Sequence, residues 1–303
     1  MSAPVFIPRE VEDRLSWVAL TEALAAGHAL PRAEIGDTFL YREGDTLLSR
    51  AAWITGLGAA VKTAMVLPAG ARRGEGRLDG AMCLLSEETG GLDAVVDFRL
   101  VTKWKTAGDS LLGALRLARP ESARVLIVGA GTVARSLLEA YGAGFPGAEF
   151  EIWNRTPSAA ERLAAGRRRT RAIGDLESAV ARADIVACAT MSASPVLRGE
   201  WLRPGQHVDL IGAYRPDMRE ADDTALRRAR IFVDSTATTL DHIGELKDPL
   251  ARGVIGRNDV IADFYDLDRF GRRSAEDITL FKNGGGAHLD LMTARYILSA
   301  WQG

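Results

Sequence analysis

The N-terminal third of the chain combines one helical pattern of apolar residues with several short strand-like runs. The helical pattern covers residues 9–28. The strand-like runs are Thr38–Tyr41, Thr46–Trp53, Ala60–Leu67, Ala81–Ser86 and Leu92–Phe98. Between the last two, Glu88-Thr89-Gly90-Gly91 predicts a hairpin turn, because paired glycines adopt a positive φ at little steric cost. Consecutive strands of this kind predict an antiparallel or mixed sheet, and a helix is expected from about Thr106 to Ala118.

From residue 123 the pattern changes to alternating strands and helices. Strands are predicted at Arg124–Val128 and Phe150–Trp153, and helices at 132–143 and 157–166. Further strands are expected at 184–188, 207–211 and 230–233. This alternation predicts an α/β fold, with a Rossmann-type, doubly wound parallel sheet covered by helices on both faces.

The last helical segment, about 286–301, has one apolar face, formed by Leu289, Met292, Tyr296 and Ala300. Our hypothesis is that this helix packs back on the N-terminal part of the chain. The prediction is therefore a discontinuous α+β domain of residues 1–119 and 286–303, and a dinucleotide-binding domain of residues 120–285. A helix 286–301 packed only on the central domain would contradict this hypothesis.

Composition narrows the class of protein. Of the 303 residues, 47% are hydrophobic and 26% charged, which is typical of a globular protein and excludes a core-poor disordered chain. Lys plus Arg is 38 against 40 for Asp plus Glu, so we expect no nucleic-acid partner. The two cysteines exclude a disulfide scaffold. Neither a secretory signal nor a membrane span is visible, so a cytoplasmic protein is expected.

The strongest local motif is Gly129-Ala130-Gly131-Thr132-Val133-Ala134, which has the form G-x-G-x-x-A. It directly follows a predicted strand and opens a predicted helix, the context in which this motif binds a dinucleotide. Gly129 permits the tight turn, Gly131 lets the backbone approach a pyrophosphate, and Ala134 is small enough for close packing of the helix on the strand. The free N–H groups of the helix N-terminus would face the phosphates.

The end of the second strand indicates which nucleotide binds. Sheets that prefer NAD carry a carboxylate there, whereas this chain has Asn154-Arg155-Thr156. The Arg155 guanidinium suits a 2′-phosphate, with Asn154 and Thr156 as neutral donors, so NADP(H) is preferred and NAD(H) remains possible. Thr190, Met191 and Ile211 follow other strand ends and are expected to line the same crevice.

A tract of three arginines, Arg167-Arg168-Arg169, follows the predicted helix 157–166. The favoured interpretation is a solvated helix end whose positive charge complements the helix dipole.

Five motifs in one order resemble the ornithine cyclodeaminase/mu-crystallin family. They span most of the chain and are Gly58-Ala59-Ala60-Val61-Lys62, Lys105-Thr106-Ala107, the glycine motif from Gly129, Gly212–Glu220 and Phe281–Gly286. The family includes cyclodeaminases, alanine dehydrogenases and NAD(P)H-dependent reductases of cyclic imino acids and ketimines. The resemblance implies a homodimer built through the N-terminal sheets.

The resemblance also implies a substrate site in the N-terminal domain. Lys62 is similar to the family's active-site lysine, and partial burial would lower its pKa and help it assist proton transfer. Lys105 stands where relatives usually carry a carboxylate-binding arginine, and we expect it to bind the substrate carboxylate as a second active-site lysine. It is also expected to precede a helix N-terminus, which favours an anion. Arg50 and Arg32 are both candidates for a further substrate arginine. His288 is a candidate proton donor, and no metal ion is expected.

Tyr214 decides between the activities of the family. Cyclodeaminases carry an aspartate there, whereas this chain resembles the reductase branch. The leading hypothesis is an NADPH-dependent reductase that converts Δ1-pyrroline-2-carboxylate or Δ1-piperideine-2-carboxylate to the L-amino acid by hydride transfer to C=N. The alternatives are an ornithine cyclodeaminase that uses bound NAD+, and a non-enzymatic, mu-crystallin-like protein that binds NADPH and a small ligand.

Overall fold

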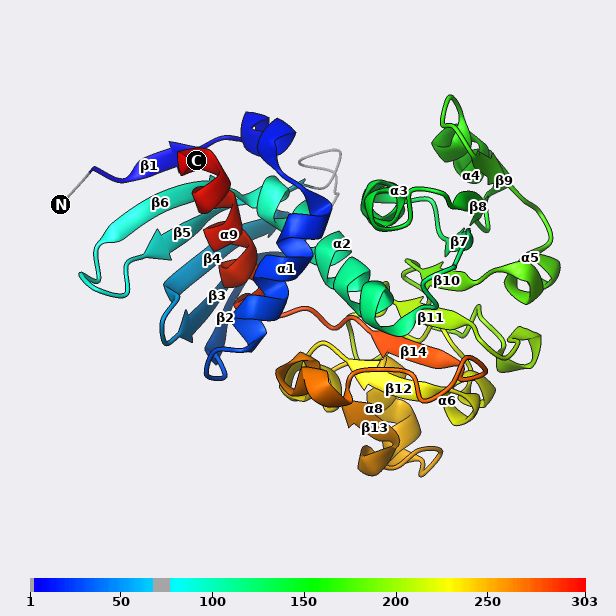
Figure 1. The fold of residues 1–303 in the computed structure, drawn as a ribbon. Coiled ribbons are helices and arrows are strands. Elements are labelled where there is room, and N and C mark those ends of the chain that lie inside the picture. The colour runs from blue at the N-terminus through cyan, green and yellow to red at the C-terminus, as the bar shows by residue number, and fades with distance from the viewer. Residues whose placement is uncertain (1–2, 68–76) are drawn as a thin grey trace. The chain divides into compact units, whose positions relative to one another are not determined.

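The computed structural model describes residues 3–67 and 77–303. The chain forms two compact units, Met1–Lys105 with Gly286–Gly303, and Thr106–Gly285 (Figure 1). Each unit contains one sheet.

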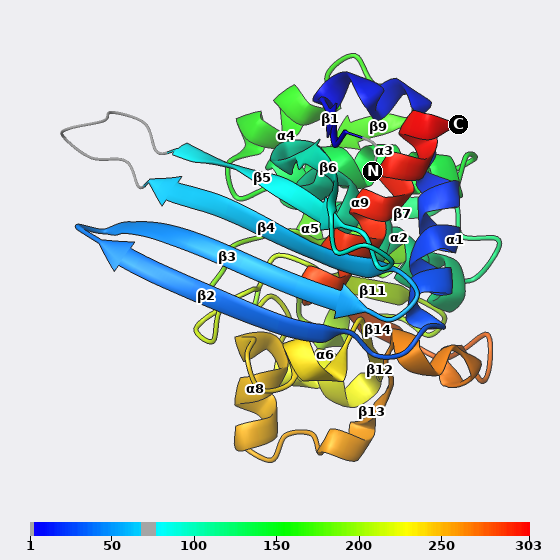
Figure 2. The same cartoon turned by 90° about the vertical axis from the view of Figure 1, so that its left-hand side faces the viewer.

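The first unit contains a six-stranded sheet in the order β1-β6-β5-β4-β3-β2, and its strands are labelled in Figure 2. Its strands are β1 (Val5–Ile7), β2 (Glu34–Arg42), β3 (Asp45–Ile54), β4 (Gly58–Leu67), β5 (Arg77–Leu85) and β6 (Leu92–Asp97). β1 pairs in parallel with β6, and all other neighbours are antiparallel. The mixed sheet is thus as predicted, although β1 was missed because three residues carry too little pattern.

Helix α9 (Ala287–Gln302) lies against this sheet, where it contacts β3 and β4, and α1 (Trp17–His28) packs beside α9 (Figure 1). In the sequence α9 follows the whole second unit, yet it belongs to the first unit. The single helix predicted over 9–28 is wrong. A 3-10 helix at Arg9–Arg14 precedes α1, and the chain is extended at Ser16, whose hydroxyl accepts a hydrogen bond from the Ala19 N–H at 3.4 Å as the N-cap.

Helix α2 (Phe98–Leu117) begins eight residues before the predicted start at Thr106. The segment from Leu92 to Phe98 is β-like and rich in apolar residues, which hid the boundary. The Asp97 carboxylate accepts a hydrogen bond from the Leu100 N–H at 2.7 Å and so caps the new helix. The correction matters for Lys105, which lies inside α2 and not at a helix N-terminus.

The second unit contains an eight-stranded sheet in the order β13-β12-β14-β11-β10-β7-β8-β9, with every neighbouring pair parallel. Its strands are β7 (Arg124–Val128), β8 (Glu149–Trp153), β9 (Thr170–Ala172), β10 (Ile185–Cys188), β11 (His207–Leu210), β12 (Arg230–Val233), β13 (Val260–Ala262) and β14 (Thr279–Lys282). This confirms the predicted α/β fold with a doubly wound parallel sheet. β9, β13 and β14 were not predicted. β9 and β13 have only three residues each, and in β14 the two apolar residues Leu280 and Phe281 lie between Thr279 and Lys282.

The helices of the second unit connect these strands. They are α3 (Thr132–Gly144), α4 (Pro157–Ala164), α5 (Leu176–Arg182), α6 (Asp223–Arg228), α7 (Thr236–Thr239) and α8 (Gly244–Ala251), with short 3-10 helices at Gly199–Trp201, Arg257–Asp259 and Phe264–Arg269. In the described parts of the chain, none of the helices is long and apolar enough to cross a bilayer.

The strand order places a switch point in the second unit. From β7 the chain adds β8 and β9 on one side and then crosses over to add β10 and β11 on the other side. The loops that leave the carboxyl ends of β7 and β10 therefore diverge and open a crevice, the usual ligand position in such sheets.

Candidate functional site

A pocket of about 430 Å³ lies at this switch point in the second unit. Its walls come from the loops that follow three neighbouring strands. These residues are Gly129, Ala130 and Gly131 after β7, Trp153, Asn154, Arg155 and Thr156 at β8, and Ala189, Thr190, Met191, Ser192 and Val196 after β10. The size and position suit a dinucleotide, whose phosphates would face the start of α3.

The glycines of the motif satisfy the geometric needs of that site. Gly129 has a φ of 122°, and a Cβ atom there would lie 2.6 Å from the carbonyl oxygen of Ala189. Gly131 is the N-cap of α3, and a Cβ atom there would meet nothing within 4 Å, so its backbone faces open space. Ala134, in the first turn of α3, is completely buried. The residues present therefore fit a dinucleotide.

The loop after β8 holds the residues that were predicted to select the nucleotide. The Asn154 side-chain amide donates to the Thr156 carbonyl at 3.0 Å, which fixes the turn into α4. Arg155 is exposed and lines the pocket, and its guanidinium has no hydrogen bond or ion pair to the residues that the structure describes. The turn thus presents an uncommitted guanidinium at the rim of the pocket.

Three of the predicted cofactor residues do not line this pocket. Thr132 and Val133 lie in the first turn of α3, and Ile211 is buried directly after β11. Thr190 and Met191 do line it, and the Met191 side chain is 76% exposed.

The buried carboxylate of Glu220 holds two strand-end loops of this pocket together. One of its oxygens accepts hydrogen bonds from the Thr190 N–H at 2.6 Å and the Thr190 hydroxyl at 2.8 Å. The other accepts from the N–H groups of Gly212 at 2.6 Å and Ala213 at 3.3 Å. The loops approach so closely that a Cβ atom on Gly212 would lie 1.8 Å from the Thr190 carbonyl oxygen. Glu220 therefore fixes one wall of the pocket, a role that the sequence analysis missed.

A second buried carboxylate supports the first. Glu245, in α8, accepts hydrogen bonds from the N–H groups of Glu220 at 2.7 Å and Ala221 at 3.0 Å. Burial, reinforced by the nearby charge of Glu245, raises the pKa of Glu220 to about 8. The backbone and hydroxyl donors around Glu220 act in the opposite direction and favour its ionised form.

The first unit contains a buried cluster of charges at Lys62, Lys105 and Asp290. Strand β4 places Lys62 on the same face as Ala60 and Ala64, which is covered by α9. Lys62 is 8% exposed, Lys105 9% and Asp290 not at all. The structure therefore brings together the two lysines that the motifs singled out and adds an acidic residue that they did not.

Asp290 binds both lysines through one oxygen. Its Oδ1 lies 2.9 Å from Nζ of Lys62 and 3.8 Å from Nζ of Lys105. Its Oδ2 is buried and has no hydrogen-bond partner among the described residues. Burial acts to raise the pKa of Asp290, but the charges of Lys105, Lys62 and Arg50 outweigh it, so the pKa lies below its ordinary value.

Burial lowers the pKa of Lys62, and the attraction of Asp290 only partly offsets it. The charges of Lys105 and Arg50 lower this pKa further. The Lys62 ammonium also lies over the ring of Phe98, with Nζ 4.8 Å from the ring centre. Lys62 is thus a cation that loses its proton more readily than an exposed lysine.

Arg50 belongs to the edge of this cluster. It lies directly opposite Lys62 in the β3–β4 pairing, and its guanidinium binds Asp37 of β2 through two nitrogens, at 2.7 Å for the shortest contact. Arg32 is exposed in the segment between α1 and β2. The charge of Arg50 lowers the pKa of both Asp290 and Lys62.

His288 lies in the first turn of α9 and is 2% exposed. Its ring meets that of His28 in α1 edge to face, with 5.5 Å between ring centres. The two rings pack α9 against α1.

Asp290 was missed because it lies beside an apolar face in a helix assigned to packing. One signal was available in the sequence: an acidic residue in the first turn of a helix that follows Gly284-Gly285-Gly286. An acid there is favoured by the helix dipole, but that preference alone does not reveal a partner from β4.

The doubly wound sheet and the pocket at its switch point define a dinucleotide-binding protein of the Rossmann class. The family model described as the ornithine cyclodeaminase/mu-crystallin family matches residues 52–303. The chain belongs to this family, as the sequence motifs predicted.

Relatives and solved structures agree with this assignment. The chain is 51% identical to the Δ1-pyrroline-2-carboxylate reductase of Paracoccus denitrificans, over 100% of this chain and 98% of the relative. An archaeal alanine dehydrogenase dimer with bound NAD is 28% identical, with a TM-score of 0.87 over 99% of this chain and 96% of that one. The Δ1-pyrroline-2-carboxylate reductase of Thermococcus litoralis, solved with NADH and L-proline, shares the fold at 24% identity, with a TM-score of 0.88 over 98% and 97%.

Proposed function

We propose that this chain, an NAD(P)H-dependent oxidoreductase acting on carbon–nitrogen double bonds, reduces a small cyclic imino acid to the L-amino acid. Δ1-pyrroline-2-carboxylate and Δ1-piperideine-2-carboxylate are the proposed substrates. The observation that carries the proposal is the buried cluster of Lys62, Lys105 and Asp290 in a chain that also has a dinucleotide pocket. The 51% identity to a reductase of this name over the full chain supports it.

The charges of the cluster suit one carboxylate ligand. Three cations, Lys62, Lys105 and Arg50, face two carboxylates, Asp290 and Asp37, which leaves one positive charge. A single substrate carboxylate would neutralise it. A buried cation without a counter-charge is costly, so the site should favour a monoanion over a neutral imine.

Lys62 is the residue that we propose assists the reaction. Reduction adds a hydride to carbon and a proton to nitrogen of the C=N bond, and a bound nicotinamide would supply the hydride. The lowered pKa of the Lys62 ammonium makes its proton easier to transfer to the developing amine nitrogen. Lys105 and Arg50 would keep the carboxylate in place, and Asp290 would hold the Lys62 side chain in one orientation.

NADPH is the proposed reductant, because the loop after β8 offers the exposed guanidinium of Arg155 and no carboxylate. We expect Arg155→Ala to lose most of the preference for NADP(H) over NAD(H), measured as the ratio of kcat/KM for the two nucleotides. An unchanged ratio would defeat this assignment.

We also propose a homodimer formed through the open face of the first unit's sheet. Met65 alternates with the buried residues Lys62 and Ala64 of β4, and it pairs with Leu47, which pairs with Leu40. Met65 is 44% exposed and Leu40 60%. Apolar side chains exposed side by side on a sheet suit a second copy of the chain, and the related alanine dehydrogenase is a dimer. We expect Met65→Glu to yield monomers in sedimentation velocity, whereas a monomeric parent would refute the proposal.

The test of the reaction is the oxidation of NADPH by the two cyclic imines, followed at 340 nm, with the amino acid product identified. Lys62→Met should raise KM for the imine and lower kcat while nucleotide affinity stays within about twofold. Lys247→Met, an exposed lysine of α8, is the matched control. No turnover with any cyclic or linear ketimine would refute the function. Proline formed from ornithine without added NADPH would instead indicate the cyclodeaminase, and binding without turnover would indicate a ligand-binding protein.

A further inference from the structure

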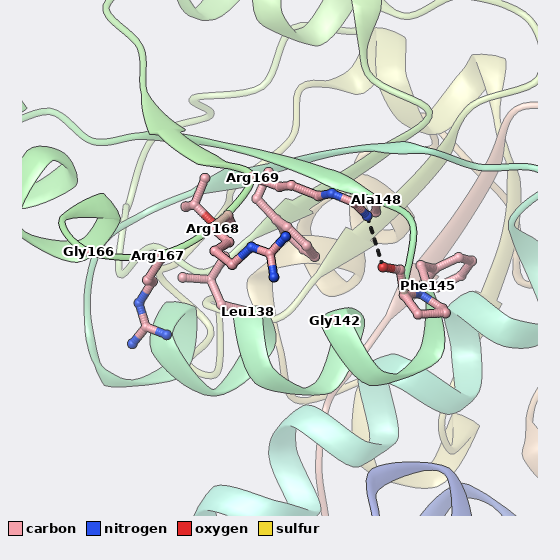
Figure 3. A pocket seen from close by; sticks show the side chains of 11 residues that line it. Leu138, Gly142, Phe145, Ala148, Gly166, Arg167, Arg168 and Arg169 are labelled. Atoms are coloured by element: carbon pink, nitrogen blue, oxygen red, sulfur yellow. Dashed lines mark hydrogen bonds between the residues drawn. The ribbon is translucent and has the colours of Figure 1, made fainter.

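A second pocket of the second unit is lined by the three consecutive arginines Arg167, Arg168 and Arg169 (Figure 3). It measures about 680 Å³, within the range of small-molecule sites. The arginines form the loop between α4 and β9, and the opposite wall is the C-terminal half of α3 with the segment that follows it.

This pocket is separate from the dinucleotide pocket. Phe150, near the start of β8, lines the arginine pocket, whereas Trp153, at its end, lines the dinucleotide pocket. Two residues of extended strand lie between Phe150 and Trp153, and the three steps from one to the other span about 10 Å. The two pockets lie at opposite ends of a parallel sheet, and the arginine pocket has no part in the function proposed above.

The arginine pocket has an unbalanced positive charge. None of its lining residues is acidic. Arg167 donates to the carbonyl of Leu163 in the last turn of α4 at 3.0 Å, as expected for a side chain that complements the helix dipole. Arg168 forms no hydrogen bond or ion pair through its guanidinium to any described residue, and Figure 3 shows it above the turn of α3 that holds Leu138 and Gly142. Arg167 thus complements the helix dipole directly, whereas the guanidinium of Arg168 is left available to a ligand.

The loop is held in shape before any ligand arrives. Arg169 has a φ of 52° and Gly166 a φ of 73°. The left-handed conformation is strained for an arginine. The carbonyl of Arg169 accepts a hydrogen bond from the Phe150 N–H at 2.7 Å, and its guanidinium donates to the Pro146 carbonyl at 3.2 Å. Arg169 is thus fixed at both ends, which lowers the entropy lost when an anion binds.

The wall beneath the guanidinium groups is apolar. Leu138, Phe145 and Phe150 are nearly buried and present only parts of their side chains. Gly142 adds no side chain, and a Cβ atom there would meet nothing within 4 Å. The floor is therefore flat and open below Arg168, with room for a ring.

We propose that this pocket binds an organic anion whose charged group is a carboxylate, sulfonate or phosphate ester on a planar apolar body. The anion would take the free donors of Arg168 and the remaining donors of Arg169, and the apolar body would lie over α3 at Gly142. A planar guanidinium donates paired hydrogen bonds to the oxygens of such groups. A flat apolar ring can also stack on a guanidinium plane and contact the edge of an aromatic side chain.

The probe for the test is 1-anilinonaphthalene-8-sulfonate, an aromatic anion that fluoresces when bound. Titrations are run with saturating NADP+, so that the dinucleotide pocket is occupied. We expect the uncharged analogue N-phenyl-1-naphthylamine to bind at least about tenfold more weakly, because it lacks the anionic group. Inorganic phosphate should compete with the sulfonate.

Two variants locate the site, and one serves as a control. Arg168→Gln should weaken sulfonate binding about tenfold, and Gly142→Leu should abolish it by filling the space over α3. Arg198→Gln removes an exposed arginine elsewhere in the same unit and should leave the affinity within about twofold. Arg168 is exposed, so its variant keeps the test valid even if Gly142→Leu does not fold.

Equal affinity of Arg168→Gln and the parent would overturn the proposal, as would a parent that does not bind the sulfonate. Equal affinity for the charged and uncharged probes would also overturn it, because the arginines would then have no role. Imine reduction can fail in the assays above without affecting any of these results.

Discussion

Replacing Asp290 by asparagine should destabilise the first unit more than any exposed charge substitution. The change removes the buried negative charge between Lys62 and Lys105 and leaves the side chain's shape nearly unchanged. Two buried ammonium groups then lie near each other without their shared counter-charge.

The structure sets the size of this effect. At the 2.9 Å distance between Lys62 and Asp290, unit charges in an effective dielectric of about 20 attract by about 6 kcal/mol. At the 3.8 Å distance to Lys105, the attraction is about 4 kcal/mol. Removing buried charges from water offsets much of this, and breaking such a pair by losing one partner costs about 3–5 kcal/mol. We therefore expect Asp290→Asn to lower the free energy of unfolding by about 3 kcal/mol or more.

The assay is urea unfolding at pH 7 of the parent, Asp290→Asn, Lys62→Met and the double variant, with a check that one transition with an unchanged m-value is seen. The double variant should be more stable than Asp290→Asn alone, because it removes one uncompensated ammonium. The cycle should give a coupling of about 2 kcal/mol or more. A loss below about 1 kcal/mol, together with additive single effects, would refute the reasoning.

The same pair predicts a pH dependence. The pKa of Asp290 in the fold lies below its ordinary value of 3.8, so its stabilisation is present above that pH and is lost as the pH falls through the lower, folded value. The stability difference between the parent and Asp290→Asn should therefore narrow in acid. A difference that widens there would contradict the assignment of the lowered pKa.

Two further predictions concern the dinucleotide pocket. Gly129→Ala should weaken nucleotide binding at least about tenfold, because a side chain at a φ of 122° is strained and would meet the Ala189 carbonyl oxygen at 2.6 Å. The control Gly147→Ala, with open space around the new Cβ atom, should bind the nucleotide as the parent does. Isothermal titration measures both affinities, and equal values for the two variants would contradict the close approach at Gly129. Glu220→Gln should weaken nucleotide binding several-fold and lower the unfolding free energy by about 1–3 kcal/mol, because an amide nitrogen would face backbone N–H groups. Glu200→Gln, on an exposed side chain, is the control, and a Glu220→Gln variant that matches it would refute the proposed role of Glu220 in holding the pocket wall.

In the alternating part of the chain, the strands that are continuous apolar runs could be predicted, as could the glycine motif, which has a fixed structural context, whereas the short strands β9, β13 and β14 could not. The elements of the first unit were harder to delimit. The start of α2 was misplaced because Phe98 continues a β-like run, and only the cap by Asp97 marks the helix. The error carried over to Lys105, which was assigned a helix N-terminus that it does not have.

Two site residues, Asp290 and Glu220, were missed for the same reason. Asp290 and Glu220 are carboxylates whose partners are far away in sequence or are backbone N–H groups, and no spacing rule reveals such partners. Lys62 and Lys105 could be selected because a family motif surrounds each. The acid between them became visible only when α9 was seen to lie against β4.

The return of α9 to the first unit has a consequence during synthesis. The residues that precede α2 reach the ribosome exit first, but their sheet lacks α9 until the whole second unit has been translated. At ordinary elongation rates this interval is about 10–40 seconds. Throughout it, the faces of β3 and β4 that α9 will cover stay uncovered and Lys62 has no Asp290, so the nascent chain is exposed to aggregation until α9 is made. A stop codon placed before Ala287, the first residue of α9, would leave every newly made molecule with these faces uncovered.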